Sequence, residues 1–152
     1  MDILKEFEKN IQRALMPGIQ GGPLMANIAA KAHTFGYAMQ SEFVTYQKKV
    51  IQNAQLMSDI FLQHNIPVIS NGTDSHLFVV DVSQYNKDGA YVQEKLEKEC
   101  NIILNKNVIP LDTKSPLTPS GIRIGTPWIT SLNYSEKKIK KIAQIIIDTI
   151  KS

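Results

Sequence analysis

Residues 115–127 read SPLTPSGIRIGTP. In this stretch a single arginine, Arg123, stands between two isoleucines, and a glycine flanks each isoleucine. The alternation predicts a β-strand over 121–125 that is closed by Thr126-Pro127. The preceding segment, 110–119, holds three prolines with Ser and Thr and has no helical period, so a long loop is expected there. A long loop of this kind is more often functional than idle.

Arg123 is the most informative single residue. A permanent charge close to an apolar layer needs compensation, and the planar fork of arginine suits a carboxylate held by two hydrogen bonds, as an amino acid would present. The alternative is an arginine on the solvent face of an edge strand, which is commoner on general frequencies. The flanking glycines favour the functional interpretation, because glycine inside a strand often marks the close approach of a ligand or another backbone.

Outward from this strand, helical and strand patterns alternate along the chain. Their order predicts an α/β sandwich in which helices cover one face of a single mixed or antiparallel sheet. Apolar spacing and capping residues predict helices over 2–15, 24–39, 41–65, from Asp88 and from Ser135. Alternation and turn residues predict further strands over 68–70, 77–82 and 102–104.

Charge and composition exclude several classes of protein. The formal net charge is +3, and the lysines are scattered along the predicted helices, which argues against nucleic-acid binding. A single cysteine and three separated histidines provide neither an internal disulfide nor metal-ligand spacing. No stretch approaches the roughly 20 apolar residues of a membrane span, and the first 15 residues lack a signal-peptide pattern, so a cytoplasmic protein without a membrane partner is expected.

Two further segments could contact a ligand. Gly21 and Gly22 precede a predicted helix and could present backbone amides to a phosphate, although from spacing alone a tight turn that needs positive φ explains them better. Asn105-Lys106-Asn107 offers two amides and an ammonium that could bind a heteroaromatic ring, or could form a solvated turn. His76 could orient a ligand or satisfy a turn, and turn satisfaction is the default.

Taken together, four segments resemble the serine hydroxymethyltransferase family: PGIQGGPL at 17–24, TDSHL at 73–77, NKN at 105–107 and the stretch at 115–127. Their order and spacing match as well, and the resemblance covers the chain from about Leu4 onward. It implies the C-terminal portion of a pyridoxal phosphate enzyme of fold type I that interconverts serine and glycine, with tetrahydrofolate as the one-carbon carrier.

The resemblance also implies a domain division and a set of site residues. Residues 1–40 would be a remnant of the large-domain segment, and 41–152 the C-terminal small domain, preceded by long bridging helices. Arg123 resembles the arginine that binds the substrate carboxylate, and Gly21 and Gly22 resemble the loop that reaches the cofactor phosphate of another subunit. The residues that resemble the folate-binding stretch are Asn107, Ser115, Pro116 and Leu117.

Three positions depart from the family pattern. Leu117 replaces the more usual aromatic residue and removes a ring edge from the pterin wall. Trp128 replaces the usual alanine after Thr-Pro and adds volume beside the carboxylate site. Asn71-Gly72 replaces the usual Gly-Gly before Thr73.

The resemblance places the cofactor-binding lysine, the stacking histidine and the aspartate that pairs with the pyridine nitrogen upstream of this chain. We therefore expect the isolated chain to be inactive, because its side chains cannot replace the electron sink of the cofactor. One alternative is half of a split enzyme that associates with a cofactor-bearing N-terminal half. Another is a non-catalytic module for amino acid or folate binding or for dimerisation. Self-association is expected from an uncovered apolar face at Leu24, Ile28, Ala29 and Phe35.

Overall fold

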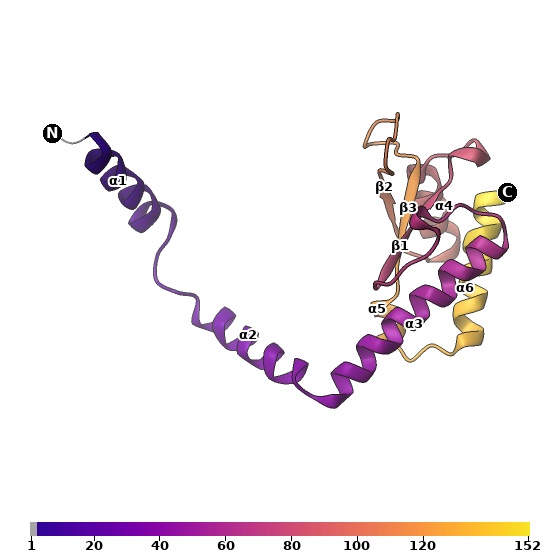
Figure 1. Ribbon diagram of the computed structural model, residues 1–152, viewed down its shortest axis with the longest axis horizontal. Helices are drawn as coiled ribbons and strands as arrows, with labels where there is room; N and C mark the ends of the chain where they lie inside the picture. Colours follow the sequence, from indigo (N-terminus) through magenta and orange to yellow (C-terminus); the bar gives the residue numbers. More distant parts are fainter. Residues whose placement is uncertain (1–2) are drawn as a thin grey trace. The chain divides into compact units, whose positions relative to one another are not determined.

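A computed structural model describes residues 3–152 of the chain (Figure 1). The chain divides into two compact units, Met1–Gln40 and Ser41–Ser152, and each is described separately. Among the described residues, every helix is too short or too polar to cross a lipid bilayer.

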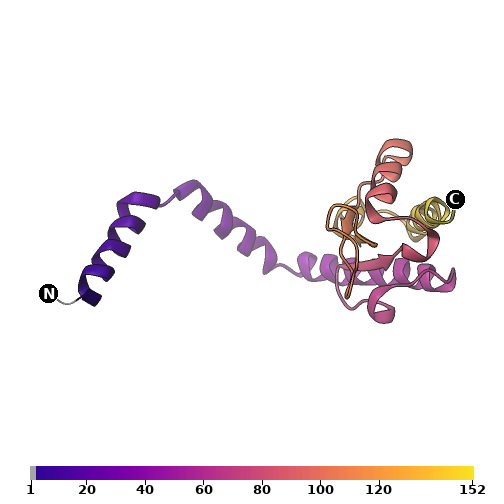
Figure 2. The same cartoon turned by 90° about the horizontal axis from the view of Figure 1, so that it is seen from above.

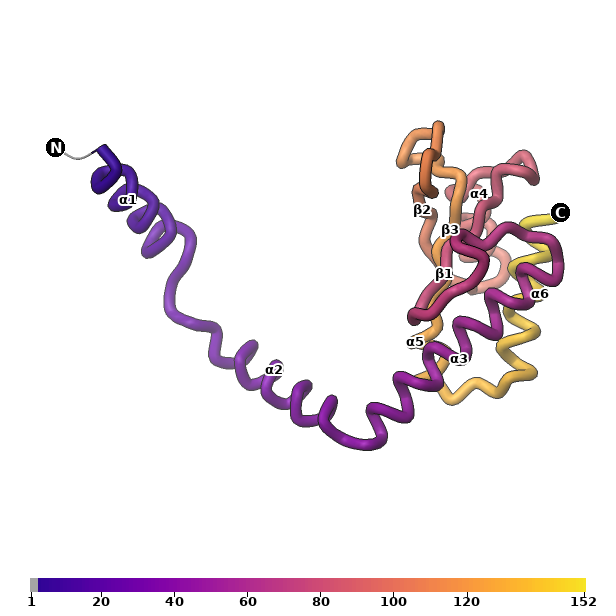
Figure 3. The backbone as a smooth tube through the Cα atoms, in the orientation of Figure 1, coloured from indigo at the N-terminus to yellow at the C-terminus, as the bar shows by residue number. Residues whose placement is uncertain are grey.

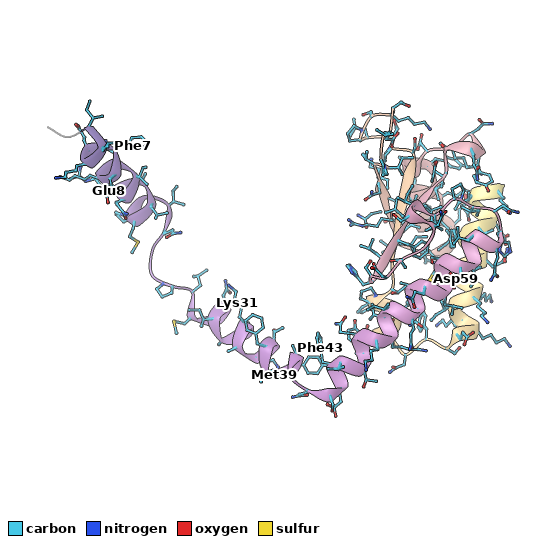
Figure 4. All side chains as sticks on the ribbon, in the orientation of Figure 1. Phe7, Glu8, Lys31, Met39, Phe43 and Asp59 are labelled. Atoms are coloured by element: carbon cyan, nitrogen blue, oxygen red, sulfur yellow. The ribbon has the colours of Figure 1, made fainter. Side chains whose placement is uncertain are left out.

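The first unit contains two helices and the loop between them. Helix α1 spans Ile3–Arg13 and is followed by a kinked turn over Ala14–Ile19, and helix α2 spans Met25–Ala38. Neither helix buries a side chain, and Phe7, which is 65% exposed, projects outward from α1 (Figure 4). Isolated helices of this length are marginally stable in water, and the larger apolar residues of this unit leave 40% or more of their surface exposed. These residues include Ile3, Leu4, Phe7, Ile11, Leu15, Leu24, Met25, Ile28 and Phe35.

The second unit is an α/β domain with a small antiparallel sheet. Its three strands are β1 (Leu77–Asp81), β2 (Asn105–Asn107) and β3 (Gly121–Gly125). They have the order β1-β3-β2, so the central strand is the one predicted from the Ile-Arg-Ile alternation (Figure 3). The elements of this unit in chain order are α3 (Ser41–Gln63), β1 (Leu77–Asp81), α4 (Gly89–Cys100), β2 (Asn105–Asn107), β3 (Gly121–Gly125), α5 (Pro127–Ser131) and α6 (Glu136–Lys151).

One face of the sheet packs on helices to form the hydrophobic core. Helices α3 and α6 pack against each other, α3 contacts β1, and α4 contacts β2 and β3; Figure 2 views α6, in yellow, nearly along its axis. Phe61 of α3 is fully buried and meets Phe78 of β1 edge to face, with ring centroids 5.4 Å apart. The other core side chains include Met57, Val80, Val92, Leu96, Ile122, Ile124, Ile139, Ala143, Ile146, Ile147 and Ile150.

Capping explains where several of these helices begin and end. The Asp88 carboxylate accepts a hydrogen bond from the Tyr91 backbone N–H at 2.8 Å, and Ser135 caps α6 in the same way, as predicted. Asn101 ends α4 in the left-handed conformation. Ser41, in contrast, lies inside α3, and its hydroxyl donates to Glu42.

Three sequence predictions of local structure were wrong. Residues 69–71 form a 3₁₀ turn, because Ser70 has a φ of +65° and cannot continue a strand, and only Val68 keeps an isolated antiparallel bridge, to Val80. The strand expected at 102–104 lies at 105–107, since the register with β3 starts at Asn105. The short helix α5 was missed, although a proline in its first turn is a favourable start signal.

Lys87 stabilises the C-terminus of α6. Its ammonium donates to the carbonyl oxygens of Thr149 at 3.1 Å and Ile150 at 2.9 Å, where the helix dipole favours a cation. We expect Lys87→Met to lower the free energy of unfolding by about 0.3–1 kcal/mol in urea titrations. Lys98→Met is the matched control, because Lys98 forms only an exposed pair with Glu94 and such pairs contribute little. Equal midpoints for the two variants would contradict this role.

Candidate functional site

Arg123 lies on the sheet face opposite the helices. Ile122 and Ile124 point into the core, so the alternation of β3 turns Arg123 to the other face, where it is exposed between its cross-strand neighbours Val79 and Asn105. No hydrogen bond or ion pair joins its guanidinium to any of residues 3–152; the two ion pairs among them lie in α4 and α6. No described residue therefore compensates this charge, and the predicted carboxylate partner would have to come from outside residues 3–152.

A shallow cavity of about 310 Å³ surrounds Arg123. Its polar lining residues are His76, Asn105 and Arg123, and Leu77 and Ile103 are among the apolar ones. The His76 side chain makes no hydrogen bond within the described residues, whereas its backbone carbonyl accepts from the Thr126 backbone N–H at 3.0 Å. The guanidinium, the amide and the imidazole can all donate hydrogen bonds, so this cavity is chemically suited to a small anion.

The two glycines of β3 have different roles. A Cβ on Gly121 would stand 2.5 Å from Ile109 Cγ2, 2.8 Å from the Asn107 oxygen and 3.1 Å from the Val80 oxygen, so this glycine is required by the fold. A Cβ on Gly125 would meet nothing closer than 3.8 Å, and Gly125 lines the Arg123 cavity. The prediction that glycine marks close approach is thus confirmed for backbone at Gly121, whereas at Gly125 a Cβ would meet only ordinary contacts.

A buried polar network fixes the end of β3 to helix α3. The Thr126 hydroxyl donates to the Val50 carbonyl at 2.8 Å, and the Asn53 amide donates to the Thr130 hydroxyl at 2.8 Å. Thr130 in turn donates to the Thr126 carbonyl at 2.8 Å. The end of the strand that carries Arg123 is therefore held by residues of α3 that lie more than 70 positions away in the sequence.

Asp112 organises the long loop before β3. Its carboxylate accepts hydrogen bonds from the Ser120 backbone N–H and hydroxyl, both at 2.8 Å, from the Lys114 N–H at 3.0 Å and from the Ile109 N–H at 3.4 Å. These donors, above all the Ser120 N–H, lower the pKa of Asp112 from 3.8 to about 2. Lys106 of β2 also holds this loop, because its ammonium donates a hydrogen bond to the Leu117 carbonyl at 2.7 Å.

The pH dependence of this loop follows from the depressed pKa of Asp112. The stabilisation is present above the ordinary value of 3.8 and is lost as the pH falls through about 2, because protonation removes acceptor capacity from the carboxylate. We expect the Asp112 carboxyl carbon resonance to titrate with a midpoint near 2. Exchange of the Ser120 and Lys114 amides should accelerate over the same range. A midpoint at 3.8 would show that the carboxylate does not hold the loop in solution.

The four residues that resemble the folate-binding stretch lie at the end of β2 and in this loop. Asn107 is half-buried, and its side-chain amide donates to the Val108 carbonyl at 2.7 Å. Ser115 accepts from the Leu117 backbone N–H at 3.2 Å and forms a local turn with Pro116 at its centre. Leu117 is 74% exposed, so its side chain is available for contacts outside this unit.

Gly21 and Gly22 lie in the loop between α1 and α2 of the first unit. Among the described residues the one glycine with positive φ is Gly72, so the tight-turn interpretation of Gly21 and Gly22 was wrong. A Cβ on either residue would meet no atom within 4 Å. Nothing in the described chain therefore requires glycine at these two positions.

Local structure explains two departures from the family pattern. Asn71 adopts a left-handed conformation with φ of +54°, which asparagine tolerates better than most residues other than glycine. Trp128 is 72% exposed in the first turn of α5, so its added volume lies at the surface of the described chain and does not fill the Arg123 cavity.

Sequence reasoning missed Asp112 and the proximity of His76 to Arg123. An aspartate followed two residues later by a backbone donor is typical of an Asx turn, and that signal could have identified Asp112. His76 precedes β1, and no local pattern indicates that β1 pairs with β3, so its place in the cavity depended on the sheet register.

Fold and site together define a small α/β domain with an exposed arginine that has no partner among residues 3–152. The chain belongs to the serine hydroxymethyltransferase family, because the sequence model of that family matches residues 1–146. It is 45% identical over 148 residues to the serine hydroxymethyltransferase of Endomicrobium trichonymphae, an alignment that covers 97% of this chain and 35% of that protein. The chain thus spans about a third of the length of this curated relative, and the resemblance noted in the sequence is confirmed.

Proposed function

We propose that this chain contributes the substrate-carboxylate and folate contacts of a serine hydroxymethyltransferase active site that further polypeptide completes. The observation that carries the proposal is the unpaired guanidinium of Arg123 beside Asn105 and His76 on an open sheet face. A rigid fork of N–H donors with no internal partner suits the carboxylate of serine or glycine. An arginine that served only solubility would have no need of the surrounding amide and imidazole.

Residues of each unit, taken separately, are compatible with pyridoxal phosphate as the cofactor, with the glycine loop of the first unit acting on the cofactor of another subunit. Gly21 and Gly22 would hold its phosphate through backbone amides, and the lack of any internal requirement for glycine there supports contact with a group outside the described chain. Arg123 would orient the amino acid by its carboxylate. When bound, the cofactor supplies the electron sink for bond cleavage next to the amino group.

Tetrahydrofolate would contact the loop held by Asp112. Asn107 and Ser115 offer polar groups, while Pro116 and the exposed Leu117 offer an apolar surface to the pterin ring. The aliphatic Leu117 lacks the stacking surface of an aromatic side chain, so folate affinity is expected to be lower than with phenylalanine at this position.

The exposed apolar residues of α1 and α2 support association with other polypeptide. We infer an assembly of fold type I, located in the cytoplasm, in which these helices pack against a cofactor-bearing part or a second copy. In this proposal residues 1–152 alone do not turn over substrate.

The test compares the isolated chain with a reconstituted enzyme. The chain would be co-expressed with the residues of the Endomicrobium relative that precede the matched segment, purified as a complex and supplied with pyridoxal phosphate, serine and tetrahydrofolate. We expect glycine formation by the complex and none by the isolated chain. A folded complex without turnover, or cofactor-dependent turnover by the isolated chain, would each overturn part of the proposal.

A further inference from the structure

Two places in the chain have a glycine directly after an asparagine or aspartate, Asn71-Gly72 and Asp88-Gly89. Such pairs can form a five-membered succinimide, because glycine offers little steric resistance to attack by its own backbone nitrogen. The asparagine pair is intrinsically the faster of the two, because an ionised aspartate side chain is a poor electrophile, so the effect of the fold on each pair is judged against the same pair in the unfolded chain. The structure distinguishes the two pairs by whether their reacting groups are accessible.

At Asn71-Gly72 both reacting groups are free. Asn71 is exposed at the end of the 3₁₀ turn, and its side-chain amide makes no hydrogen bond to residues 3–152. The Gly72 backbone N–H likewise donates to none of the described residues. The side of Gly72 where a Cβ would stand is open, with no atom within 4 Å.

At Asp88-Gly89 the same groups are held by the fold. The Asp88 carboxylate caps α4 through the Tyr91 N–H at 2.8 Å. The Gly89 N–H donates to the Pro119 carbonyl at 2.7 Å, and Gly89 is packed so closely that a Cβ would stand 2.0 Å from the Gly121 oxygen. Attack by the Gly89 nitrogen would require both the cap and this packing to open.

We propose that Asn71 is a site of spontaneous deamidation in the folded chain and that Asp88 is protected. The Gly72 nitrogen loses its proton and attacks the Asn71 side-chain carbonyl carbon, and ammonia leaves as the ring closes. One water molecule then opens the ring at either carbonyl, which yields aspartate or its isomer linked through the side-chain carbon. No oxidant or cofactor is needed.

The product changes the turn that leads into β1. A carboxylate replaces a neutral amide at a cavity of about 570 Å³ lined by residues 69–75 and 77–79. The isomer also lengthens the backbone by one methylene between residues 71 and 72, next to Thr73, whose hydroxyl donates to the Leu77 carbonyl at 2.6 Å. Deamidation therefore places a negative charge and a lengthened backbone in the turn that precedes β1.

Four other asparagines provide internal controls. Asn65, Asn86, Asn101 and Asn133 have φ values between +52° and +59°, close to the +54° of Asn71. Each is followed by a larger residue in place of glycine. If left-handed geometry alone determined reactivity, these four would deamidate as well.

The experiment incubates the full chain, folded or in urea, at mildly alkaline pH to follow each asparagine by peptide mass spectrometry and at mildly acidic pH to follow Asp88, because an ionised aspartate closes the ring only slowly. Isoaspartyl methyltransferase labelling detects the isomerised linkage. In the folded chain we expect the mass increase at Asn71, no increase at the four controls and no isoaspartate at Asp88. In urea we expect Asp88 to isomerise too, and Asn71→Gly to remove the signal at that turn under both conditions.

Three outcomes would overturn the inference. The first is an intact Asn71 in the folded chain under conditions that convert it in urea, which would mean that the turn protects it. The second is equal conversion at the four control asparagines. The third is isoaspartate at Asp88 in the folded chain at the rate found in urea.

Discussion

Replacing Arg123 with glutamine is expected to lower kcat/KM of the reconstituted enzyme for serine by roughly two to three orders of magnitude. An unpaired ligand carboxylate in a closed site costs about 2–5 kcal/mol, and each 1.4 kcal/mol corresponds to a factor of ten. Arg123→Lys should be intermediate, because lysine keeps the charge but cannot hold a carboxylate through a planar fork. The measurement is the rate of glycine formation across serine concentrations.

The fold provides the control for this experiment. Arg123 has no partner among the described residues and is exposed. Neither variant should therefore change the free energy of unfolding, measured by urea titration, by more than about 0.5 kcal/mol, the effect of a typical surface substitution. Lower activity with an unchanged midpoint separates a binding role from a structural one. If Arg123→Gln kept wild-type kcat/KM in a folded complex, Arg123 would not be the carboxylate receptor.

The second large effect is expected from Gly89→Ala, which should destabilise the Ser41–Ser152 unit by about 1–3 kcal/mol or more. The added Cβ would stand 2.0 Å from the Gly121 oxygen and 3.2 Å from the Pro119 oxygen. Both are backbone atoms, so relief requires helix α4 to move away from β3. That movement would also stretch the 2.7 Å hydrogen bond from the Gly89 N–H to Pro119.

Gly125→Ala is the matched control for Gly89→Ala. The same methyl group at position 125 meets only ordinary contacts of 3.8 Å and beyond, so the unfolding midpoint should stay near that of the wild type. Circular dichroism in urea titrations of the full chain would measure both variants. Equal midpoints would show that the close packing of α4 on β3 is absent in solution.

Local pattern was sufficient for much of the fold. The Ile-Arg-Ile alternation fixed β3 at 121–125, and apolar steps of three and four residues fixed α3 and α6 to within about two residues. Asp88 and Ser135 marked helix starts correctly. These signals are local, since each depends on residues within one or two turns of the element that it predicts.

The family could also be inferred from sequence, and for a different reason. Four short segments in the right order resembled serine hydroxymethyltransferases, and the family match over residues 1–146 agrees with that inference. The roles of Arg123, Gly21, Gly22 and the folate stretch came from the same resemblance, and they remain predictions until the variants are measured.

Tertiary structure decided the features that depend on residues far apart in the chain. Periodicity showed that Arg123 lies opposite the isoleucines, but only the packing of α3, α4 and α6 on one face shows that its own face is open. Three other features likewise appear only after folding. They are the close packing of Gly89 on Gly121, the hydrogen bonds from Ser120 to Asp112, and a Gly72 N–H that donates to none of the described residues. A sequence pattern specifies which way a side chain points from its own backbone, whereas pairing between strands and helices determines what it meets.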